Sequence, residues 1–187
     1  VLLNNDKPNI TNINNNIKVP KNDKKKVEFV LHGKENVDHI TKEIVLKLFM
    51  EKFSIVCKEL MKLIYFNEKV PQNSTWCIAY PKNKKAGVVY NQETKEFERV
   101  YTQKIIEEKF ANMIELLFPL VHSIQHDEEL YPTLEEIQKA NLVCFLSHFG
   151  IYNIAEESPF IYETMRELCY EYKRIPMKIW GENGYKG

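Results

Sequence analysis

The sequence has little glycine, with 6 residues among 187. This scarcity argues against a glycine-rich nucleotide-binding fold, because a phosphate-binding loop needs several glycines to turn its backbone amides inward. Long apolar runs are also missing, and none reaches the roughly 18 residues that a membrane-spanning helix needs. No secretion signal opens the chain. We therefore expect a protein that is neither membrane-spanning nor secreted.

Charge of one sign is not in excess either, since 26 basic residues balance 26 acidic ones. No global field points to nucleic acid or to a membrane surface, although a local basic patch still can. The four cysteines lie far apart, without the close pairs that zinc sites use. They predict free thiols in a reducing compartment, and nothing in the sequence indicates a cofactor. These cysteines are Cys57, Cys77, Cys144 and Cys169.

Composition divides the chain into three parts. Residues 1–26 are rich in asparagine and lysine and nearly free of large apolar residues, so they predict a flexible arm. Residues 27–176 predict a single α+β domain, whose part after 118 is a helical extension. Residues 177–187 predict an irregular tail, because Pro176 stops the helical pattern just before them.

Three short runs of β-branched and aromatic residues, at 76–80, 86–90 and 96–101, predict an antiparallel meander. A similar run at 27–31 predicts a further short strand, so the sheet has three strands, or four if this one joins it. Apolar residues at helical spacing predict about five helices packed with this sheet, which is an α+β fold. The predicted helices span about 42–53, 55–66, 103–124, 134–149 and 158–174.

Hydroxyl residues and prolines mark the expected helix ends. Pro119 should kink or end the long third helix, because it lacks the backbone N–H that a helix interior uses. Thr133, with Glu136 three residues later, has the sequence of a capping box. The expected N-cap residues are Thr41, Ser54, Thr102, Thr133 and Ser158.

The stretch 31-LHGKENVDHITKE-43 packs two histidines and three acidic residues into thirteen positions. His32, Asp38 and His39, together with Glu35, could form a metal site or an acid–base pair, but no spacing of convergent partners supports either. We expect instead a strand-to-helix connection, in which Ile40 packs at the helix start and His39 bonds nearby backbone. No catalytic residue is predicted, and we expect no enzyme activity.

Several short motifs follow one another from this stretch onward: Gly-Lys-Glu, His-Ile-Thr, Lys-Leu-Ile, Phe-Asn and Pro-x-Asn, then three short strands and a helix with Glu-Glu-Lys. In this order residues 28–118 resemble an uncharacterised domain of nucleocytoplasmic large DNA viruses, of the mimivirus and marseillevirus kind. The sequence departs from the pattern at Glu68, where proline is commoner, and at the basic turn 81–87. The family has no established activity, so the resemblance implies origin and fold. The matching residues are Gly33, Lys34, Glu35, His39, Ile40, Thr41, Lys62, Leu63, Ile64, Phe66, Asn67, Pro71 and Asn73.

His122 and His126 are the best metal candidates, because residues four apart on a continuous helix share a face. Pro119 interrupts the helical pattern nearby, and the glutamate of metalloproteases is absent between the two histidines. The alternative is a polar, solvated helix end.

Two functions fit the sequence. Ten tyrosines, ten phenylalanines and amphipathic helices favour a protein-binding accessory protein, a virion or assembly component that binds a protein partner or self-associates as a homo-oligomer. The alternative is a nucleic-acid-binding protein that uses the basic arm and a basic, aromatic sheet surface. The resemblance implies a place in the virion or in the host cytoplasm, at the viral factory. The nucleic-acid candidates are Lys18, Lys21, Lys24, Lys25, Lys26, Lys82, Lys84, Lys85, Trp76 and Tyr80.

Overall fold

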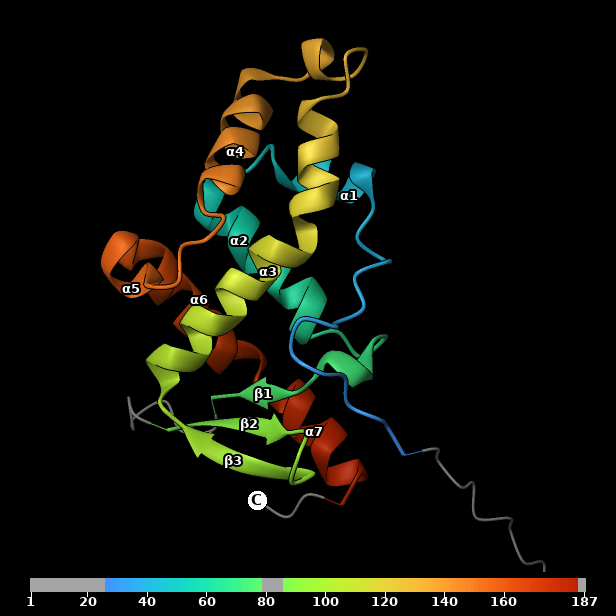
Figure 1. Cartoon of the computed structure of the whole chain (residues 1–187), viewed down its shortest axis with the longest axis vertical. Coiled ribbons are helices and arrows are strands. Elements are labelled where there is room, and N and C mark those ends of the chain that lie inside the picture. Colours follow the sequence, from blue (N-terminus) through green and yellow to red (C-terminus); the bar gives the residue numbers. More distant parts are fainter. Residues whose placement is uncertain (1–25, 79–85, 185–187) are drawn as a thin grey trace, which may run out of the picture.

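The structure is a computed structural model and describes residues 26–78 and 86–184 (Figure 1). Within these ranges the chain forms seven α-helices and one antiparallel sheet, which confirms the α+β class. The helices are α1 (Lys42–Leu48), α2 (Phe53–Tyr65), α3 (Thr102–Gln125), α4 (Glu136–Ser147), α5 (Ile154–Glu157), α6 (Pro159–Tyr172) and α7 (Arg174–Glu182). The strands are β1 (Trp76–Cys77), β2 (Gly87–Asn91) and β3 (Glu96–Val100).

The sheet is the predicted meander, with strand order β1-β2-β3 and Trp76 paired with Val89. The fourth strand predicted at 27–31 is wrong. Backbone groups there bond outside any ladder: Val30 N donates to Gln72 O at 3.1 Å, and the Gln92 side chain donates to two carbonyls of the segment. The segment is therefore attached by side-chain and turn contacts.

Helix α3 runs through the middle of the molecule, with α1, α2 and α4 around its C-terminal half and the sheet near its N-terminal end (Figure 1). Pro119 does not end this helix, which continues to Gln125. Pro119 is exposed, while Leu117, Val121 and Ile124 on the other side are buried. Their burial in the core holds the helix together across the proline.

Two of the expected N-caps are confirmed in position and three are wrong. The Thr41 hydroxyl accepts from the backbone N–H of Ile44, and Ser158 precedes α6. The capping box lies two residues later than predicted, because Glu135 and Gln138 form it and start α4. The residues that do not cap as expected are Ser54, Thr102 and Thr133, which lie inside α2, at the first position of α3 and in a 3-10 turn.

The irregular tail predicted at 177–187 is wrong for residues 177–182, because residues 174–182 form α7. Residues 185–187 of that prediction lie outside the described residues. Pro176 lies in the first turn of that helix, where no backbone N–H is needed. Ile179 and Trp180 are buried, and Trp180 Nε1 donates to Ser74 O at 2.5 Å. This helix therefore packs beside the sheet. None of the helices described has the length and apolar character to cross a membrane.

Candidate functional site

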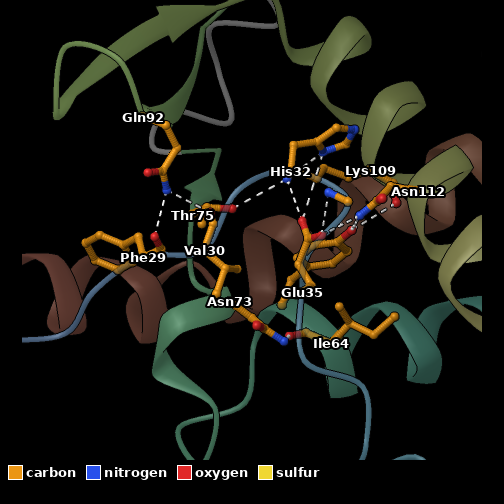
Figure 2. A network of polar contacts seen from close by, with 12 residues as sticks. Phe29, Val30, His32, Glu35, Ile64, Asn73, Thr75, Gln92, Lys109 and Asn112 are labelled. Atoms are coloured by element: carbon orange, nitrogen blue, oxygen red, sulfur yellow. Dashed lines mark hydrogen bonds and ion pairs between the residues drawn. The ribbon is translucent and has the colours of Figure 1, made fainter.

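A buried ion pair joins the loop before α1 to helix α3 (Figure 2). Lys109 Nζ lies 3.0 Å from Glu35 Oε1, and each residue is only 4% exposed. Removing two charges from water costs several kcal/mol for each ion, roughly, so such a pair persists only where further hydrogen bonds satisfy both groups.

The Lys109 ammonium is fully satisfied. Besides Glu35, it donates to Thr75 Oγ1 at 3.4 Å and contacts His32 Nδ1 at 3.1 Å. An ammonium has three N–H donors and no acceptor, so His32 Nδ1 must be the acceptor in its contact. With all three donors used and no lone pair, Lys109 is a structural anchor and lacks the free amine of a nucleophile.

The Glu35 carboxylate is satisfied as well. Its Oε2 accepts from Gly33 N at 2.8 Å and from Asn112 Nδ2 at 2.9 Å. The left-handed backbone of Gly33, at φ +80°, turns the chain so that this N–H reaches the carboxylate. Asn112 also donates to Tyr65 Oη at 2.6 Å, and Tyr65 Oη donates to Lys109 O at 3.4 Å. The network therefore connects the loop, α2 and α3.

Burial and charge shift three pKa values in this network. Burial lowers the pKa of Lys109, and Glu35 opposes that change. Burial alone would raise the pKa of Glu35, but Lys109 and Asn112 outweigh it and the pKa lies below its ordinary value. Burial first and Lys109 second lower the pKa of His32. An ionised Glu35 beside a neutral His32 is the charge state that the geometry supports.

Three of the short sequence motifs between residues 28 and 118 meet around this network. Glu35 comes from Gly-Lys-Glu, Lys109 from Glu-Glu-Lys, and Asn73 from Pro-x-Asn. Asn73 is fully buried and donates to Asn36 O at 2.8 Å and Ile64 O at 3.1 Å. These residues hold the loop against α2 and α3, which is a structural reason for their presence.

Sequence reasoning missed Lys109 and Asn112 as partners of Glu35. Both lie on the side of α3 that also buries Ile105, Ile106 and Met113. A lysine and an asparagine inside an apolar helical stripe are the signal that was available, because buried polar groups need partners. The signal does not identify the partner.

The other predictions for the stretch 31–43 are confirmed in part. His39 Nε2 lies 2.9 Å from Leu63 O, and Ile40 is buried in the core. The stretch is thus a helix start, as expected, although the described residues before it, 26–30, form no strand. Across residues 26–78 and 86–184, no group of three or more His, Cys, Asp or Glu side chains is placed to hold a metal ion.

His122 and His126 lie at the end of α3, whose continuity brings the two rings together. The rings are stacked, with centroids 4.0 Å apart, and His126 Nδ1 lies 3.0 Å from His122 O. A His126 Nδ1 that contacts a backbone carbonyl oxygen is not available to a metal ion. The arrangement is that of a surface stack.

Eight of the ten predicted nucleic-acid-binding residues lie outside the described ranges. Lys26 is described and exposed. For Trp76 the prediction is wrong: it is fully buried, with its ring 5.6 Å from Tyr65 and 5.4 Å from Phe66, so it presents no face to a base. The eight are Lys18, Lys21, Lys24, Lys25, Tyr80, Lys82, Lys84 and Lys85.

A row of four rings lies on the outer side of α3. Phe149, which follows α4, lies 4.5 Å from Phe118; Phe118 lies 5.4 Å from His122; and His122 stacks on His126. Phe149 is 53% exposed, and both histidines are exposed. We call these four residues the aromatic row. Sequence reasoning named its two histidines but missed the rings that continue it, because Phe149 joins only through the fold.

Searches against protein-family models, curated proteins and solved structures found no match.

Proposed function

We propose that the protein is a non-enzymatic accessory component of a large DNA virus, and that it binds another protein through the aromatic row. The observation that carries this proposal is a continuous line of four rings, with Phe149 at its exposed end. Aromatic side chains are enriched at the centres of protein interfaces, where their loss costs most of the binding energy. The viral origin, and a place in the virion or the host cytoplasm, rest on the sequence resemblance.

Helix α4, which packs against α3, adds a second apolar surface. Its buried side includes Leu142 and Phe145, yet Ile137 and Val143 on the other side are exposed. The same exposed side carries Glu136 and Ser147, so Ile137 and Val143 are two apolar side chains on a mixed surface. These two side chains add to the apolar area that is available to a partner on this part of the molecule.

The charges around the aromatic row indicate which kind of partner fits it. Glu115 lies near one end, where it accepts from the Tyr152 hydroxyl at 2.7 Å. Glu128 and Glu129 are exposed just beyond His126 at the other end. A second copy of the chain would bring the same acidic side chains against these, whereas a partner with basic residues around an apolar patch would complement them. We therefore propose a different protein as the partner.

Affinity purification of the tagged full chain from infected cells tests the proposal, with Phe149→Ser compared against Phe160→Ser. Phe160 is a matched control, since it is a 73% exposed phenylalanine on α6 that has no part in the row. A partner should co-purify with the unchanged chain and with Phe160→Ser. It should then bind Phe149→Ser roughly 30-fold more weakly in a titration of purified proteins.

Two results would count against this proposal. If every co-purified protein survives Phe149→Ser, the row is not the binding surface. If light scattering shows a dimer that Phe149→Ser abolishes, the occupant is a second copy of the chain and the charge argument is wrong.

A further inference from the structure

A depression of about 470 Å³ lies between the β2–β3 hairpin, the residues just before the stretch 31–43 and the end of α7. Helix α7 itself lies beside the sheet (Figure 1). Phe29, Tyr90 and Phe97 line it, together with two exposed lysines, Lys26 and Lys95. Neither the Glu35–Lys109 network nor the aromatic row contributes a residue to it. The depression combines apolar rings with positive charge, and the proposed function uses neither.

Hydrogen bonds hold the walls of the depression in place. Val27 N donates to Asn183 Oδ1 at 2.6 Å, which attaches the N-terminal wall to the end of α7. Gln92 Nε2 donates to Phe29 O at 2.7 Å and to Val30 O at 2.9 Å, which attaches the same wall to the hairpin. A preformed cavity binds a ligand without first having to order its walls.

The three rings hold one another in fixed orientations. Phe29 lies 4.9 Å from Tyr90, and Tyr90 lies 5.1 Å from Phe97, each pair tilted. Phe97 packs on the buried Trp180 at 4.2 Å. Offset or edge contacts stabilise aromatic pairs at such distances. A further planar ring can pack on these three rings by contacts of the same kind. Ring stacking binds nucleobases in this way with little sequence preference.

Lys95 has an unusual backbone. It is the only non-glycine residue in the described part of the chain with a positive φ, at +60°. Glycine adopts this conformation without strain, whereas a side chain at the turn costs conformational energy. The lysine keeps a positive charge beside the rings, where its Nζ donates to Gln92 Oε1 at 3.3 Å. The left-handed residue closes the β2–β3 turn, and its side chain places a cation at the edge of the depression.

Glu96 also lines the depression, so the two lysines and one carboxylate leave one positive charge. The lysine ammonium groups donate hydrogen bonds to an anionic group, and the Glu96 carboxylate accepts them from hydroxyl groups. These three side chains therefore fit a ligand that carries both an anion and hydroxyls. We propose that the depression binds a nucleoside monophosphate, either a free nucleotide or the end of a single strand. The base packs on the rings, the phosphate contacts Lys26 and Lys95, and the ribose hydroxyls face Glu96.

Isothermal titration of the full chain at low salt tests this inference, with adenosine 5′-monophosphate, adenosine and inorganic phosphate as separate probes. The monophosphate should bind at one site, and adenosine and phosphate should each bind roughly ten-fold more weakly or worse, because each lacks one of the two contacts. Lys95→Gln, which removes the charge, and Lys95→Gly, which also relieves the backbone, should weaken monophosphate binding alike, by roughly ten-fold. Lys104→Gln, at an exposed lysine of α3, should leave it unchanged.

A short single-stranded oligoriboadenylate with a 5′-phosphate, which keeps the base, the phosphate and the 2′-hydroxyl of the monophosphate, distinguishes the two sources of the ligand. Binding roughly ten-fold tighter than that of the monophosphate, and weakened by Lys95→Gln, would assign the depression to strand ends; equal or weaker binding assigns it to free nucleotides. The inference is overturned if the monophosphate gives no binding heat, if phosphate alone binds equally well, or if Lys95→Gln binds as the unchanged chain does. Thermal unfolding of both Lys95 variants confirms that a loss of binding is not a loss of fold.

Discussion

The Glu35–Lys109 network and the aromatic row both connect α3 to distant parts of the chain, but their surroundings are opposite. In the network two charged side chains are buried and every donor of Lys109 is used. In the row, apolar and aromatic surface is left in contact with solvent. Burial is what separates a contact that maintains the fold from one that is available to a partner.

The difference has an energetic meaning. A buried ion pair contributes little net stability compared with apolar side chains of similar volume, but losing one member leaves an uncompensated charge. An exposed ring pair contributes little to folding, because most of its surface stays in water. A substitution in the network should therefore act on the fold, and one in the row should act on binding.

The largest effect is expected from Lys109→Met. The change leaves Glu35 charged and buried without its cation, so the free energy of unfolding should fall by about 3–5 kcal/mol. Urea unfolding followed by circular dichroism measures it. A loss below about 1 kcal/mol would mean that water reaches Glu35 and that the pair is not buried in solution.

The double variant Glu35→Leu with Lys109→Met distinguishes two causes of instability. One is the loss of the attraction between the two charges, and the other is the burial of an unpaired Glu35 carboxylate. It should be more stable than Lys109→Met alone, because no unpaired charge remains. Equal stabilities of the single and the double variant would contradict this account.

Much of the fold is predictable from local pattern. Short β-branched and aromatic runs were enough to predict the meander, and the apolar stripe of α3 predicted the long helix. Helix α7 was missed because Pro176 was interpreted as a terminator, whereas a proline in the first turn is compatible with a helix. Local pattern also misplaced the strand at 27–31, whose backbone bonds to side chains and turns that only the fold brings near.

The candidate sites were much less predictable. Glu35 and Lys109 are 74 residues apart, and no periodicity relates a loop carboxylate to a helix lysine. Trp76 illustrates the reverse error, since an aromatic residue on a short strand was expected at the surface and is fully buried. Which face of a strand is covered depends on helices elsewhere in the chain, here including α7.

A smaller loss of folding stability is expected when the pH is lowered. The pKa of His32 is lowered in the folded protein, so the folded chain binds this proton less readily than the unfolded chain. The associated stability is complete above the ordinary value of 6.5 and is lost as the pH falls toward the lowered pKa. Glu35 behaves in the same way below its ordinary value of 4.5.

We therefore expect the urea midpoint to fall in two stages as the pH is lowered, the first starting below pH 6.5 and the second below pH 4.5. His32→Asn should reduce the first stage and leave the second, because Glu35 is still present. If the unchanged chain and His32→Asn lose stability equally over this range, other histidines account for the first stage.

Phe149→Ser should change the free energy of unfolding by about 0.5–1 kcal/mol, the range expected for one ring contact at a half-exposed position. Thermal unfolding measures the change, and Phe160→Ser provides the baseline for an exposed phenylalanine. A loss comparable to that of Lys109→Met would show that the aromatic row is part of the core and would remove the argument for a partner.

The smallest effect is expected from Lys104→Met, which removes an ion pair from the same helix as Lys109. Lys104 Nζ lies 3.7 Å from Glu108 Oε1, and the two side chains are 64% and 52% exposed. An exposed pair of this spacing contributes less than about 0.5 kcal/mol, and added salt screens it further. Lys104→Met and Lys109→Met thus make the same chemical change and differ in burial. If urea unfolding gave equal losses for both, burial could not be the variable that separates the network from the surface.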